Sequence, residues 1–116
     1  MANSGASYIL RAEGVDVINP DAQVLGGISE WVKVAHLALA QEVAIAAHGN
    51  QEVHVHLATG VPGGILLEYY PRAVVGLMSE MVLTPLTFED GFVRPPEAPG
   101  LGVELDWTHL ERHRVL

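Results

Sequence analysis

Three polar residues, Asp21, His48 and Glu68, each stand at the end of a short apolar run. The runs that they end are residues 15–21, 43–48 and 65–68. In a parallel α/β barrel, catalytic groups lie at the carboxyl ends of successive strands. A carboxylate beside an imidazole fixes its tautomer and stabilises the imidazolium, which makes a general acid or base near neutral pH. The pattern therefore predicts that Asp21 and His48 form a proton-transfer dyad.

Each of these residues also has a plainer interpretation. Asp21 could cap a turn after Pro20, and His48 could be a strand-end residue without a catalytic partner. If burial raised the pKa of Glu68, its carboxyl group could hydrogen-bond a substrate anion. A strand-end glutamate that faces water would have no such role. The residue types alone leave both interpretations open.

A second candidate is the run Glu52–His56, which contains His54 and His56. On a strand, His-x-His places both imidazoles on one face, and imidazole is a common metal ligand. On a helix the two positions diverge, and no recognised ligand set is completed. Because we predict a helix for residues 51–59, we favour two helix histidines, one packed and one exposed.

The elements that would position these residues follow from the hydrophobic pattern. Residues 15–19, 43–47 and 65–69 are predicted strands, and the second is apolar throughout, as a strand buried on both faces should be. Between the first two strands, Ser29 is predicted to cap a helix that runs to about Glu42. The order strand–helix–strand–helix–strand predicts parallel strands with right-handed crossovers.

The sequence changes character after about residue 84, where proline and glycine become frequent. Residues 86–93 contain an Asp-Gly pair and are predicted to form a hairpin. A short helix is predicted for residues 106–114, with Asp106 or Thr108 as its cap.

Size and charge narrow the classes of function. The chain has 116 residues, of which 49% are hydrophobic, and a formal net charge of -8. Its six scattered Lys and Arg residues argue against a nucleic-acid partner, and the lack of cysteine excludes disulfides and thiolate chemistry. No segment is long and apolar enough to span a membrane, and the N-terminus lacks a secretory signal pattern. We therefore expect a soluble cytoplasmic protein.

Several motifs resemble the C-terminal barrel domain of the mandelate racemase and muconate lactonizing branch of the enolase superfamily. They run in order along nearly the whole chain: Pro20-Asp21, residues 26–31 (GGISEW), residues 47–57 (AHGNQEVHVHL), residues 67–69 (LEY), Pro85-Leu86, Asp90-Gly91 and residues 99–106. The Gly-Asn-Gln-Glu run after His48 is most similar to the acid-sugar dehydratase members.

The resemblance implies an α/β fold, a partial TIM-type barrel. The chain would supply the sixth to eighth parallel strands of a modified (β/α)7β barrel, with intervening helices and a Pro/Gly-rich C-terminal tail. The partial barrel would occupy residues 1–84. The tail, residues 85–116, would carry the hairpin and pack on a capping domain that this chain lacks.

The resemblance also implies roles for the three polar residues. Asp21 and His48 would be the catalytic dyad, and Glu68 would hydrogen-bond the substrate carboxylate as it becomes an enediolate. In the family, magnesium held by carboxylates on the third to fifth strands stabilises that enediolate, and a lysine base lies on the second strand. This chain has no Lys-x-Lys motif, and its only lysine is Lys33. We therefore expect it to bind no magnesium tightly, and to have no dehydratase or racemase activity, by itself.

The sequence is consistent with three functions. The first is a fragment of a magnesium-dependent acid-sugar dehydratase, which removes a proton alpha to a carboxylate and expels water. The second is a non-catalytic module, because three parallel strands expose open edges and an apolar face. Such a module would form a homo-oligomer or bind an N-terminal fragment that carries the remaining strands. The third is a metal-binding module built on His54 and His56.

Overall fold

The computed structural model describes residues 3–76 and 80–115, and the chain divides into two compact units. The first unit is Met1–Glu68 and the second is Tyr69–Leu116. Asp21, His48 and Glu68 all lie in the first unit. The division into a partial barrel of residues 1–84 and a tail of residues 85–116 stays a prediction.

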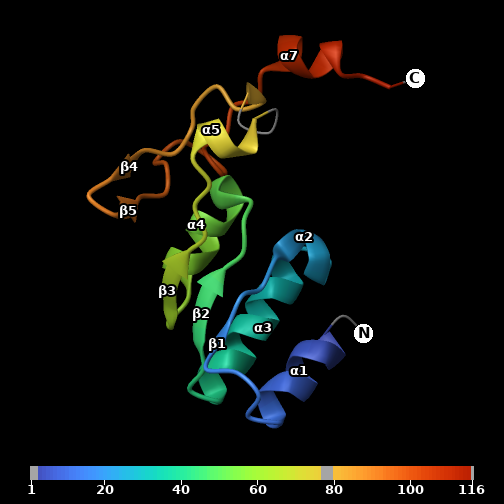
Figure 1. Cartoon of the computed structure of the whole chain (residues 1–116), viewed down its shortest axis with the longest axis vertical. Coiled ribbons are helices and arrows are strands. Elements are labelled where there is room, and N and C mark those ends of the chain that lie inside the picture. Colours follow the sequence, from blue (N-terminus) through green and yellow to red (C-terminus); the bar gives the residue numbers. More distant parts are fainter. Residues whose placement is uncertain (1–2, 77–79, 116) are drawn as a thin grey trace. The chain divides into compact units, whose positions relative to one another are not determined.

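The first unit contains a parallel sheet of three strands in the order β1-β2-β3 (Figure 1). The strands are β1 (Val17–Ile18), β2 (Ala44–Ala47) and β3 (Gly64–Leu67). The middle strand pairs on both sides, and its Ile45 and Ala47 are fully buried. The alternate positions are only half-buried, so one face of β2 is covered less completely than the apolar run predicted. The predicted α/β arrangement with three parallel strands is therefore correct, although each strand is shorter than expected.

Four helices accompany the sheet: α1 (Asn3–Arg11), α2 (Ala22–Leu25), α3 (Ile28–Ala40) and α4 (Gln51–Gly60). The helix in α4 confirms the helical interpretation of the histidine run. The prediction that Ser29 caps α3 is wrong, because Gly27 holds the N-cap position. Gly26 and Gly27 both have positive φ, 97° and 114°, so the chain turns from α2 into α3 at this pair and Ser29 already lies in the helix.

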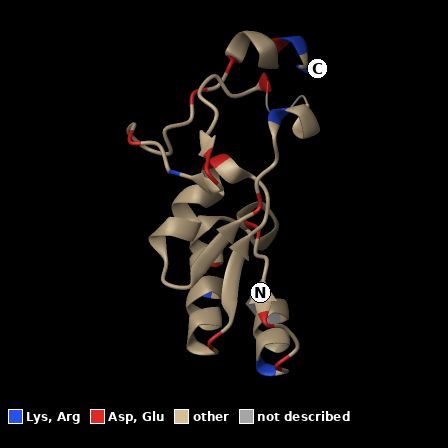
Figure 2. Ribbon diagram, turned by 60° about the vertical axis from the view of Figure 1, so that its left-hand side comes forward, with Lys and Arg blue, Asp and Glu red and all other residues tan. Residues whose placement is uncertain are grey.

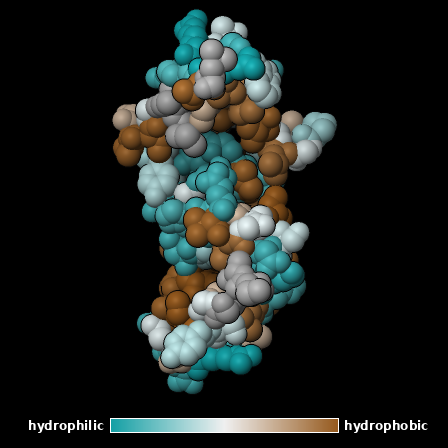
Figure 3. All heavy atoms as spheres, turned by 90° about the vertical axis from the view of Figure 1, so that its right-hand side faces the viewer, coloured by the Kyte–Doolittle hydropathy of each residue, from teal (hydrophilic) through white to brown (hydrophobic). Residues whose placement is uncertain are grey.

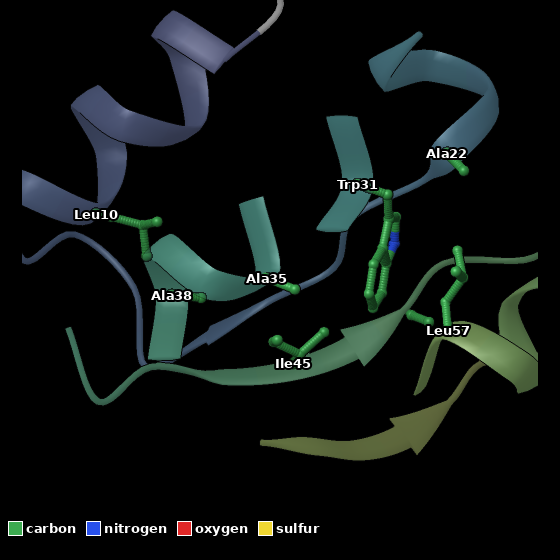
Figure 4. Close-up of a cluster of buried hydrophobic side chains, with 8 residues drawn as sticks. Leu10, Ala22, Trp31, Ala35, Ala38, Ile45 and Leu57 are labelled. Carbon is green, nitrogen blue, oxygen red and sulfur yellow. The ribbon is translucent and has the colours of Figure 1, made fainter. Parts of the chain in front are cut away.

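The core of the first unit lies where α3 and α4 face β2 (Figure 4). Trp31 of α3 has no exposed surface, and the close-up shows its ring between Ile45 and Leu57. The indole Nε1–H donates to the backbone oxygen of Pro20, 3.0 Å away. The core thus reaches the residue that precedes Asp21, and packing there fixes the start of the loop after β1.

The close approach of α4 to β3 explains why residue 64 is a glycine. A Cβ added at Gly64 would lie 2.1 Å from the backbone oxygen of Ala58, which no side chain can tolerate. Only glycine lets the strand start this close to the helix.

The second unit contains α5 (Arg72–Val75), an antiparallel hairpin and α7 (Trp107–Arg112). The hairpin pairs β4 (Phe88–Glu89) with β5 (Phe92–Val93), as predicted. Both central turn residues have positive φ, 50° at Asp90 and 84° at Gly91, which suits a tight hairpin turn. Of the two predicted caps of α7, Asp106 is correct, since its side chain accepts the N–H of His109.

Acidic side chains outnumber basic ones in both units (Figure 2), in line with the net charge of -8. Within the described ranges, no helix has the length and hydrophobicity that crossing a membrane requires.

Candidate acid–base site

Asp21 and His48 follow β1 and β2, and the parallel pairing of these strands brings them to one edge of the sheet. Nδ1 of His48 lies 2.9 Å from Oδ2 of Asp21. The backbone N–H of His48 also donates to the oxygen of Pro20, at 3.1 Å. Side-chain and backbone contacts together hold the two residues in register, so the pair predicted from strand-end positions does meet in space.

The two oxygens of Asp21 have different partners. Oδ1 accepts the backbone N–H of Gln23 at 2.7 Å and so caps α2, while Oδ2 contacts His48. The side chain is 13% exposed. The plainer interpretation of Asp21 as a cap is therefore also correct, and one carboxylate performs both tasks.

These contacts decide the charge of Asp21. Burial by itself would raise the pKa of the carboxyl group, but the hydrogen bonds from His48 and from the Gln23 N–H outweigh it and bring the pKa below the ordinary value of 3.8. Asp21 is therefore an anion at neutral pH. An anion next to Nδ1 keeps a proton on that nitrogen and leaves Nε2 as the exchangeable position of His48.

Glu68 follows β3 and lies beside that second nitrogen. Its Oε2 accepts the backbone N–H of Gly49 at 3.1 Å and lies 3.6 Å from Nε2 of His48. Its own backbone N–H donates to Ala47 at 2.9 Å, which continues the ladder past the end of the strand. His48 therefore has a carboxylate at each ring nitrogen. The Glu68 side chain is 40% exposed.

His54 of α4 is a member of this site that the sequence did not assign to it. Its side chain has no exposed surface. Nδ1 lies 2.7 Å from the oxygen of Gly49, and Nε2 accepts the N–H of Ala22 at 2.9 Å. Helical spacing in the sequence could have indicated this role. Gln51, His54 and Val55 fall at i, i+3 and i+4, which places them on one face of α4, and all three are buried.

The donors do not fit a metal site. In the part of the chain that the structure describes, no group of three or more His, Cys, Asp and Glu side chains could hold a metal ion. Both ring nitrogens of His54 already have backbone partners, and Nδ1 of His48 is paired with Asp21. A metal centre built on His54 and His56 therefore lacks support.

Comparison with known proteins places this arrangement in a family. The model of the family described as "Enolase C-terminal domain-like" matches residues 4–109. The D-galactonate dehydratase of Verminephrobacter eiseniae is 37% identical over 120 residues, which cover 91% of this chain and 31% of that protein. The 3,6-anhydro-alpha-L-galactonate cycloisomerase of Streptomyces coelicolor is 33% identical over 106 residues, which cover 91% and 28%.

Solved structures of enzymes from this family have the same fold as this chain. The L-talarate dehydratase of Polaromonas sp. JS666, complexed with Mg and L-glucarate, matches with a TM-score of 0.81 at 28% identity over 91% of this chain and 28% of that one. A mandelate racemase/muconate lactonizing enzyme matches with a TM-score of 0.88 at 26% identity over 97% and 32%. The chain thus spans less than a third of these relatives. It belongs to the enolase C-terminal domain-like family, in the mandelate racemase and muconate lactonizing branch.

Proposed function

We propose that this chain supplies the proton-transfer side of the active site of a magnesium-dependent acid-sugar dehydratase. The observation that carries the proposal is the 2.9 Å contact between Asp21 and His48 at the carboxyl edge of a parallel sheet. The names of relatives support the substrate class, since they include D-galactonate, D-xylonate and L-rhamnonate dehydratases.

In this proposal His48 is the general acid. Asp21 occupies Nδ1, so Nε2 is the nitrogen that can deliver a proton to a substrate. The imidazolium would donate from Nε2 to the hydroxyl group on the carbon beta to the substrate carboxylate, and that group would leave as water. The anion of Asp21 stabilises the imidazolium before the transfer and orients the neutral ring after it.

Glu68 is proposed to contact the substrate carboxylate. Its Oε2 is held by Gly49 beside Nε2 of His48, so the two side chains would handle neighbouring groups of one substrate. Two carboxyl groups attract each other only when one of them carries a proton that it can donate. Because the side chain is 40% exposed, this role requires that substrate or further barrel strands cover it.

Magnesium is the proposed cofactor of the complete enzyme, and the crystal structure of the Polaromonas talarate dehydratase contains it. Because the donors of this chain do not fit a metal site, we propose that the metal ligands and the base lie outside these 116 residues. The tail, residues 85–116, would pack on a capping domain. We propose that the chain alone is inactive.

A chimera tests the proposal. This chain replaces the matched segment of the Verminephrobacter D-galactonate dehydratase, and dehydration of D-galactonate is measured with magnesium present. We expect turnover by this galactonate chimera and a loss of about 10²- to 10⁴-fold with His48→Gln, the usual contribution of a general acid. His36→Gln, at an exposed position of α3, is the matched control and should retain the rate. Full activity of the His48→Gln chimera would contradict the assignment.

One observation favours a second function, that of an assembly module. Among the described residues, the outer strands of the order β1-β2-β3 each pair on one side only, and Ile65 and Leu66 of β3 are 58% and 63% exposed. Figure 3 shows hydrophobic residues at the surface among hydrophilic ones. Light scattering on the purified chain distinguishes the cases. A discrete inert dimer would support the module, and activity restored only by the remaining barrel strands would support the enzyme.

A further inference from the structure

One buried imidazole connects the residues that directly follow the two members of the proposed dyad. Nδ1 of His54 lies 2.7 Å from the oxygen of Gly49, the residue after His48. Nε2 of His54 lies 2.9 Å from the nitrogen of Ala22, the residue after Asp21. His54 thus ties the loop after β2 to the loop after β1.

These partners select one form of the ring. A backbone carbonyl can only accept, so Nδ1 must carry the proton that it donates to Gly49. A backbone N–H can only donate, so Nε2 must be bare to accept from Ala22. The two contacts are compatible only with the neutral Nδ1–H tautomer of His54.

The form of this ring matters to Asp21. Nε2 of His54 lies 3.9 Å from Oδ1 of Asp21. With Nδ1 protonated, a further proton on Nε2 would place a cation beside the carboxylate and would face the Ala22 N–H. When Nε2 of His54 is unprotonated, the Asp21 carboxylate keeps its hydrogen bonds with the Gln23 N–H and with His48.

The surroundings leave the ring little freedom. His54 has no exposed surface, and its centroid lies 6.3 Å from that of Trp31. The Trp31 Nε1–H and the His48 N–H both donate to Pro20, so contacts from the core fix the loop before Asp21 while His54 fixes it afterwards. The carboxylate is held from both sides.

We infer that His54 is a positioning residue of the dyad, held as the neutral Nδ1–H tautomer so that Asp21 and His48 keep their contact. The catalytic meaning of this inference rests on the proposed function, whereas the linkage between the two loops does not. Nothing in the role requires His54 to touch substrate.

Nitrogen NMR of the full 116-residue chain, labelled at histidine, tests the inference at neutral pH. We expect the His54 resonances to report a protonated Nδ1 and a bare Nε2. An Nε2–H tautomer, or protonation of both nitrogens, would overturn the inference whatever the variants do.

Substitutions test the consequence for His48. His54→Asn keeps a donor near the Nδ1 position, His54→Gln keeps an acceptor that reaches toward the Nε2 position, and His54→Leu keeps neither. The readout is the hydrogen-bonded Nδ1–H proton of His48. We expect this signal to be lost in His54→Leu, partly retained in the two amide variants and unchanged in the exposed control His36→Gln. An unchanged signal in a folded His54→Leu chain would overturn the positioning role.

The two proposals fail in different ways. If the dyad does not transfer protons, the galactonate chimera will be insensitive to His48→Gln while the His54 tautomer persists. If His54 does not position the dyad, the dehydration rate of the chimera will still fall with His48→Gln, but the Nδ1–H signal of His48 will be unchanged by substitutions of His54. If His54→Leu does not fold, the tautomer of His54 in the native chain still tests the inference.

Discussion

Oδ2 of Asp21 lies 2.9 Å from Nδ1 of His48, while the other oxygen of the same carboxylate caps α2 through the Gln23 N–H. One side chain thus links a helix start to the ring of a residue on the next loop. Because the cap fixes the direction of the carboxylate, the geometry offered to His48 is built into the local fold.

The cap gives a prediction for stability. Asp21→Ala removes the acceptor for Gln23 and the partner of His48, and we expect the free energy of unfolding to fall by about 1–2 kcal/mol, as for other lost N-caps. Urea unfolding measures the change. Gln23→Ala keeps the backbone N–H and alters only an exposed side chain, so it should stay within about 0.5 kcal/mol of the native chain. Equal losses of unfolding free energy in the two variants would mean that the contacts of Asp21 do not stabilise the fold.

The lowered pKa of Asp21 predicts a dependence of stability on pH. The folded state binds the Asp21 proton less readily than the unfolded state, whose pKa is near the ordinary 3.8. The stabilisation is therefore complete above that value and is lost as the pH falls through the lower folded pKa. We expect the unfolding free energy to decline in this acid range, and less steeply in Asp21→Asn. Identical slopes for the native chain and Asp21→Asn, from urea titrations at several pH values, would refute this.

The contact of α4 with β3 predicts opposite effects at two nearby glycines. Gly64→Ala would place its Cβ 2.1 Å from the Ala58 oxygen, and we expect a loss of about 1–3 kcal/mol or more from the forced shift. A Cβ at Gly60, the last residue of α4, meets nothing within 4 Å, so Gly60→Ala should be neutral or stabilise by up to about 1 kcal/mol. Thermal unfolding separates them. A harmless Gly64→Ala would show that the helix does not lie this close to the strand.

Much of the first unit was predictable because its signals are local. Short apolar runs that end in polar residues mark the parallel strands, and the parallel order places Asp21 and His48 at one edge. The Asp-Gly pair predicted the hairpin for a similar reason, since both residues adopt positive φ there.

Other features depend on contacts that no local pattern records. The start of α3 at Gly27 rather than Ser29 follows from the turn out of α2, a four-residue helix without a hydrophobic period of its own. The part played by His54 depends on two backbone partners, one 32 residues before it and one five residues before it. The helical interpretation of the His-x-His pair predicted one packed histidine, and His54 is that residue, whereas its two backbone partners leave no mark in the local sequence.

A double-mutant cycle in the galactonate chimera tests the dyad most directly. The dehydration rate is measured for Asp21→Asn, for His48→Gln and for both together. If the two residues act as one proton-transfer unit, the double variant loses no more than the worse single variant, about 10²- to 10⁴-fold. If their losses multiply, the residues act independently, and the account of Asp21 and His48 as a dyad is wrong.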